Sequence, residues 1–113
     1  NHPVAAILID LMHMNRSNEK IPDLNDPIFS YIQGCDFYQS SKKLSGDNYI
    51  IAAIDDRCCL GQGEAIKSEI IKMCKSNADV SLEIRSKELR DKFPDPFKRA
   101  SYIFKNCIRE NYL

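Results

Sequence analysis

Apolar residues recur at helical spacing along most of this chain. The first such stretch covers residues 4–12, where apolar side chains lie three or four positions apart. A second begins at Asp26-Pro27, an N-cap followed by proline at the first helical position, and continues to about residue 41. Both stretches predict amphipathic helices, joined by a polar loop over residues 17–25.

The pattern predicts three further helices after residue 45. Two cover residues 47–60 and about 63–76, with Gly61 between them as a C-terminal stop. The last begins at Asp95-Pro96, which repeats the N-cap and proline start, and it has the cleanest apolar periodicity of the chain.

One segment, residues 80–92, is ambiguous. Val80, Leu82 and Ile84 alternate with polar residues, as in a strand, whereas residues 87–92 are strong helix formers. We favour a helix here, because a single strand would have no partner.

The sequence therefore predicts one all-α domain over residues 1–113. We expect a compact bundle of five or six short helices, stapled by about two disulfides, since this length allows one modest core. The residues expected in the core are Ile7, Leu8, Ile32, Ile50, Ile54, Ile70, Phe97, Phe104 and Ile108.

Composition narrows the function. Apolar residues make up 43% of the chain, which suits a folded domain, and no apolar run reaches the length of a membrane helix. The 16 basic and 16 acidic residues balance, which argues against a nucleic acid partner.

The charge is distributed unevenly. Residues 1–79 hold 11 acidic and 8 basic side chains, and residues 80–113 hold 5 acidic and 8 basic ones. This split indicates either a solvated helix face or a basic patch that meets an acidic protein partner. The candidate partner-binding residues are Arg85, Arg90, Lys98, Arg99 and Arg109.

Five cysteines are the strongest chemical signal. They are Cys35, Cys58, Cys59, Cys74 and Cys107. This usage is typical of a small secreted protein with disulfides and one thiol left over. Adjacent helical residues point about 100° apart, so the vicinal pair is a poor metal site, and we expect no metal or cofactor. No base accompanies the thiols, so we expect no enzymatic activity.

Helix geometry limits the disulfide pairing. In an antiparallel pair of helices around Gly61, Cys74 lies at the far end from the vicinal cysteines. It is eleven residues past Gly63, which is about 16 Å along a helix and too far for a disulfide. Cys74 then pairs with Cys107, and Cys35 takes either Cys58 or Cys59. The remaining thiol is either buried or joins two chains in a dimer.

Asn15-Arg16-Ser17 forms an N-glycosylation sequon in a predicted loop. Asn15 is therefore the candidate glycosylation site of a secreted chain.

Short helices that carry the cysteines resemble the small all-helical salivary proteins of anopheline mosquitoes, and more distantly the insect odorant-binding proteins. The first resemblance implies a secreted, extracellular inhibitor of a partner protein, such as a host complement or contact-activation protein. The second implies the alternative, a carrier of a small hydrophobic ligand in a helical cavity. Neither resemblance supplies active-site residues.

Overall fold

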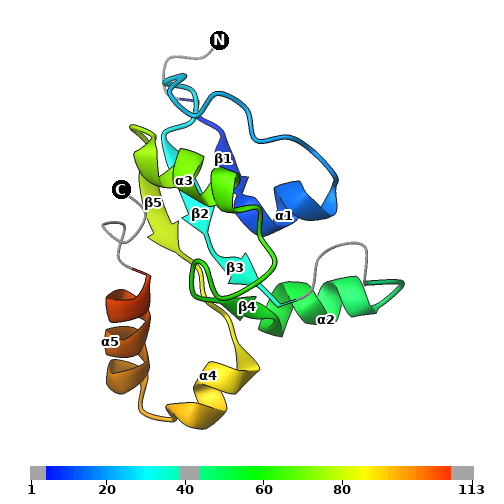
Figure 1. The fold of residues 1–113 in the computed structure, drawn as a ribbon, viewed down its shortest axis with the longest axis vertical. Coiled ribbons are helices and arrows are strands. Elements are labelled where there is room, and N and C mark those ends of the chain that lie inside the picture. The colour runs from blue at the N-terminus through cyan, green and yellow to red at the C-terminus, as the bar shows by residue number, and fades with distance from the viewer. Residues whose placement is uncertain (1–4, 39–43, 108–113) are drawn as a thin grey trace.

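A parallel sheet lies at the centre of the fold in this computed structural model, which describes residues 5–38 and 44–107. The described residues form five helices, this three-stranded parallel sheet and a two-stranded antiparallel sheet (Figure 1). The chain is therefore mixed α/β, and the all-α bundle that the sequence predicts is wrong.

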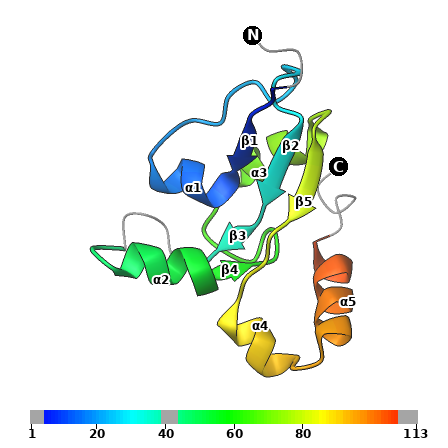
Figure 2. The same ribbon diagram turned by 180° about the vertical axis from the view of Figure 1, so that it is seen from behind.

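The parallel sheet has the strand order β1-β2-β5. Its strands are β1 (Leu8–Asp10), β2 (Tyr31–Gly34) and β5 (Asp79–Leu82), which place Ile9 beside Ile32 and Ile32 beside Val80. Helix α3 (Lys67–Lys75) lies against one face of this sheet, as Figure 2 shows from behind. Strand β1 forms one edge and β5 forms the other.

The remaining elements surround the carboxyl ends of the strands and one end of the molecule (Figure 1). They are α1 (Leu11–Arg16), β3 (Asp36–Phe37), α2 (Asn48–Asp55), β4 (Arg57–Cys58), α4 (Lys87–Lys92) and α5 (Pro96–Asn106). No helix of the described residues has the length and apolar character needed to cross a bilayer.

Two stretches predicted as helices contain strands instead, because their apolar residues pack as part of a sheet. In the first stretch, Leu8–Asp10 form β1, and only residues 11–16 form the helix α1. The stretch predicted as helical after Pro27 forms β2 and β3. The alternation around Val80 does mark a strand, β5, whose partner β2 lies far away along the sequence.

The observed core differs from the predicted one. Its main cluster includes Ile9, Leu11, Ile32, Ile70 and Met73. Of the predicted core residues, those exposed are Ile7, Leu8, Ile50, Ile54, Phe97 and Phe104, and Ile108 lies outside the described residues. Only the predictions for Ile32 and Ile70 are confirmed.

All five cysteines lie in the described residues, and all are buried free thiols. The expected disulfide staple is therefore wrong, because the all-α bundle that would bring those cysteines into pairs does not form. Cys35 follows β2 and Cys58 lies in β4, while Cys74 and Cys107 border one hollow without being bonded. Cys59 instead shares a hydrogen bond with Cys107.

Candidate functional site

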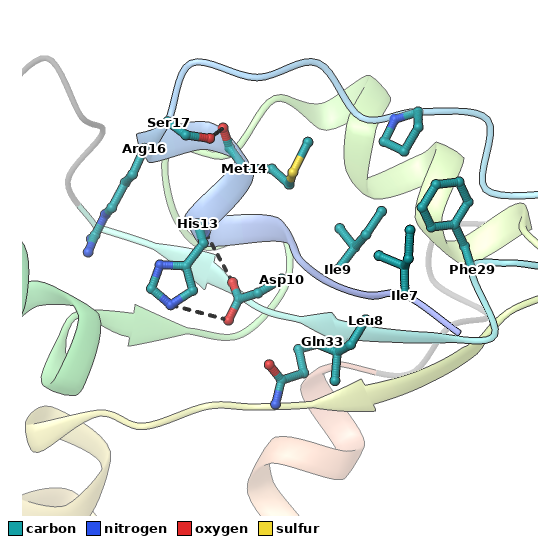
Figure 3. A pocket seen from close by; sticks show the side chains of 11 residues that line it. Ile7, Leu8, Ile9, Asp10, His13, Met14, Arg16, Ser17, Phe29 and Gln33 are labelled. Atoms are coloured by element: carbon teal, nitrogen blue, oxygen red, sulfur yellow. Dashed lines mark hydrogen bonds and ion pairs between the residues drawn. The ribbon is translucent and has the colours of Figure 1, made fainter. Parts of the chain in front are cut away.

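A groove of about 790 Å³ follows the edge of the sheet along β1. Figure 3 shows this groove from close by. Its lining residues come from β1, α1, β2 and the segment between α1 and β2. They are Ile7, Leu8, Ile9, Asp10, His13, Met14, Arg16, Ser17, Pro22, Phe29 and Gln33.

Asp10 fixes the junction between strand and helix at this groove. Its Oδ1 accepts hydrogen bonds from the backbone N–H groups of Met12 at 2.8 Å and His13 at 3.1 Å. These bonds cap the start of α1, whose first N–H groups have no partner within the helix. The cap turns the chain out of the sheet directly after β1 and places α1 at the end of the groove.

The walls of the groove are mostly apolar. Ile7, Ile9, Met14 and Phe29 point to one side of β1, and Leu8 points to the other (Figure 3). Leu8 is 50% exposed and Ile7 is 46% exposed. The groove therefore exposes apolar side chains on both sides of a strand edge.

The segment between α1 and β2 supports the wall opposite β1. Ile21 and Leu24 from this segment are buried in the main core. Lys72 of α3 donates its Nζ to the carbonyl oxygen of Ile21 at 2.9 Å. These contacts hold the segment beside β1, so that Pro22 and Phe29 border the groove.

A buried arginine contacts residues at the carboxyl ends of all three parallel strands. Arg57 is 3% exposed and lies beside Asp10 at the end of β1, Cys35 after β2 and Glu83 after β5. Its Nη2 donates to Asp10 Oδ2 at 2.9 Å, and its Nη1 donates to Cys35 Sγ at 3.2 Å and lies 3.7 Å from Glu83 Oε2. Its Nε donates to the carbonyl of Ala53.

The ionisation of this cluster is set by burial and by charge. Burial opposes the charged form of Arg57, but Cys35, Asp10 and Glu83 outweigh it and raise the arginine pKa. Burial raises the pKa of Cys35 to about 12, and Arg57 offsets only part of that rise. Cys35 is therefore a protonated thiol at neutral pH and a poor nucleophile.

A second buried carboxylate shapes the Gly61–Ala65 turn. Asp36 is fully buried and accepts hydrogen bonds from the N–H groups of Phe37, Gly61, Gly63 and Ala65 at 2.8–3.0 Å. A Cβ at Gly63 would lie 2.3 Å from the carbonyl oxygen of Phe37, so the turn admits no side chain there. Asp36 thus has a clear structural role.

Of the basic residues singled out from the sequence, the four that the structure describes do not line the groove. Arg85 and Lys98 are exposed near α4 and on α5. Arg90 pairs with Asp55 at 2.6 Å, and Arg99 donates to the carbonyl of Phe93. Arg109 lies outside the described residues, and partner binding by this basic group stays a prediction.

Asn15 lies within α1 and is half-buried, so the prediction that its sequon sits in a loop is wrong. Its Oδ1 is buried without a hydrogen-bond partner. This placement disfavours a glycan, although glycosylation itself stays a prediction.

The sequence did not predict this groove, because the groove lies along the edge of a strand. The contiguous apolar run before Asp10 has the length of a buried strand as well as helical spacing, and that length was the available signal. Among residues 5–38 and 44–107, no cluster of three or more histidine, cysteine or acidic side chains has the arrangement to hold a metal. No family model, curated protein or solved structure matches the chain.

Proposed function

We propose that this chain is a non-enzymatic binding domain that holds a segment of a partner protein in the groove along β1. The observation that carries the proposal is the apolar lining of this groove on an exposed strand edge. Exposed apolar surfaces rimmed by polar groups are typical of protein interaction sites. At the rim, His13 and Gln33 supply hydrogen-bonding side chains.

The ionisable groups near the groove support binding over catalysis. Ligands of parallel α/β sheets commonly sit at the carboxyl ends of the strands. Here Asp10 caps α1 and pairs with Arg57, which also contacts Cys35 and Glu83. These groups hold the strand ends together, and each is engaged by a neighbour within the fold.

Secretion, inhibition of a complement or contact-activation protein and dimer formation through an odd cysteine stay predictions of the sequence. The free thiols remove the argument that cysteine pairing offered for secretion.

A small apolar molecule is the second candidate occupant. The volume of about 790 Å³ lies within the range typical of small-molecule sites, roughly 300–1,000 Å³. This alternative places the ligand in an open groove at the sheet edge.

A pair of matched variants tests the proposal. Peptides are first selected for binding to the intact chain from a random library of about ten residues. Leu8→Lys places a charge in the groove, whereas Ile51→Lys places the same charge on α2, where Ile51 is 62% exposed. We expect Leu8→Lys to weaken a selected peptide at least about tenfold, through lost apolar burial and a desolvated charge, and Ile51→Lys to leave it unchanged.

Equal effects of the two substitutions would contradict the proposal. Saturable 1:1 binding of a hydrophobic dye that is lost in Leu8→Lys, without any peptide being selected, would instead establish the small-molecule alternative.

A further inference from the structure

We propose that the partner segment binds as an extended strand, added to the open edge of β1 through backbone hydrogen bonds. This inference rests on the proposed function and specifies the conformation of the partner. The occupant is a partner peptide in β conformation whose side chains alternate between the two sides of the sheet.

The hydrogen bonds of β2 show which of its groups face β5. The N–H of Asp79 donates to the carbonyl of Ser30, and the N–H of Glu83 donates to the carbonyl of Gly34. Backbone groups alternate in direction along a strand, so the groups of Tyr31 and Gln33 face the opposite way, towards β1.

The same alternation fixes the direction in which the backbone N–H and C=O groups of β1 point. Tyr31 and Gln33 flank Ile32, whose partner in the register is Ile9. In a parallel pair, a residue bonds to the two neighbours of its partner, so Ile9 directs its N–H and C=O towards β2. The N–H of Ile7 points the same way, since it donates to Ile28 at 2.8 Å.

Leu8 therefore directs its N–H and C=O away from the sheet. No backbone hydrogen bond outside the ladders of the described residues involves Leu8. Unpaired groups on an exposed edge strand are a template for another extended chain. An extended peptide would pair with these backbone groups, whereas a helix or a compact ligand would leave them unpaired.

The shape of the groove agrees with an added strand. Four consecutive residues, Ile7 to Asp10, line it, so it runs along the strand and meets both sides of the sheet. Ile7 and Leu8, which are exposed and point to opposite sides of β1, offer contacts to alternate side chains of the incoming peptide (Figure 3). The opposite edge strand differs, because Val80 and Leu82 of β5 border a hollow together with Phe104 and Cys107 at the end of α5.

Two substitutions at Leu8 separate backbone from side-chain recognition. Leu8→Pro removes the outward N–H, and proline is tolerated on an edge strand where that group faces solvent. Leu8→Ala removes the side chain and keeps the N–H. With a fluorescent peptide selected as above, we expect Leu8→Pro to weaken binding at least about tenfold more than Leu8→Ala does. Circular dichroism of both variants establishes that each is folded.

Methylated peptides supply a readout that does not depend on the folding of a variant. Two versions of the same peptide carry N-methyl groups on its odd or its even residues. An added strand directs every second N–H towards β1, so we expect one version to lose at least about tenfold in affinity and the other to bind within about twofold of the parent.

A peptide that binds with equal loss in both methylated forms, or that binds Leu8→Pro as well as Leu8→Ala, overturns strand addition while groove binding stands. Failure to select any peptide that depends on Leu8 overturns the proposed function as well. Sedimentation of the unliganded chain tests whether a second copy of the chain occupies this edge instead. A dimer that Leu8→Pro abolishes would show that it does and would overturn the proposal.

Discussion

Asp36 illustrates how one buried residue sets the geometry around it. Its carboxylate satisfies four backbone N–H groups, three of which belong to the Gly61–Ala65 turn. A buried acceptor that joins separate segments restrains the backbone more strongly than a surface ion pair does. The sequence offered no sign of this role, because a single aspartate carries no spacing pattern.

Replacing this carboxylate tests its structural role. Asp36→Ala leaves four N–H groups without their acceptor, and we expect the free energy of unfolding to fall by roughly 3–5 kcal/mol. Asp91→Ala is the control, since Asp91 is exposed and forms a surface ion pair with Lys87, and its effect should stay within about 0.5 kcal/mol. Urea unfolding measures both. Equal urea midpoints for the two variants would refute the role of Asp36.

Cys35 makes stability depend on pH in the alkaline range. Its pKa rises from 9.0 to about 12 on folding, chiefly because of burial. The unfolded chain therefore loses this proton first, and the contribution of Cys35 to stability is complete below pH 9 and disappears as the pH approaches 12. We expect Cys35→Ala to show a shallower loss of stability over this interval in urea titrations. A slope identical to that of the native chain would count against a buried thiol.

Helix α2 shows how an apolar pattern can mislead at the scale of an element. The sequence places Ile50 and Ile54 in a core, yet they are exposed, and Ala52 is the buried residue of this helix. A spacing of four residues marks one face of a helix but does not say whether that face meets the core or a partner.

Substitutions on α2 separate these possibilities. We expect Ile50→Gln and Ile54→Gln each to change the free energy of unfolding by less than about 0.5 kcal/mol, since both side chains already meet water. Ala52→Gln inserts a polar side chain into a buried position and should cost at least about 1–3 kcal/mol. Thermal unfolding gives the comparison, and a large loss from the isoleucine variants would show that these side chains are buried.

Local signals predicted helices better than strands. Asp95-Pro96 correctly predicts the start of α5, because capping and the fixed φ of proline act within one turn. The β1–β2 and β2–β5 pairs join segments far apart in the sequence, and their stability comes from partners that no local window contains. The candidate groove depends on that pairing, so the sequence could supply its residues but not their arrangement.

Across the whole molecule, we expect the exposed basic residues and the groove to act at different steps of partner binding. Arg85 and Lys98 are exposed around α4 and α5, which lie at one end of the molecule (Figure 2). Exposed charges chiefly affect association, whereas buried contacts chiefly affect dissociation.

Charge reversal tests the contribution of these basic residues. We expect Arg85→Glu with Lys98→Glu to slow association with an acidic partner at low salt, and the difference to shrink as salt screens exposed charges. Leu8→Lys should act mainly by speeding dissociation. Surface plasmon resonance at two salt concentrations measures both rates, and an association rate unaffected by the reversal at low salt would exclude these residues from steering.

Hydrogen exchange at the Leu8 amide is the sharpest test of whether a partner segment joins the edge of β1. This N–H points outward and should exchange readily in the free chain, whereas the N–H of Ile9 is already paired with β2. On saturation with a selected peptide, we expect exchange at Leu8 to slow at least about tenfold while exchange at Ile9 changes little. Unchanged exchange at Leu8, with new protection on α2 instead, would contradict strand addition.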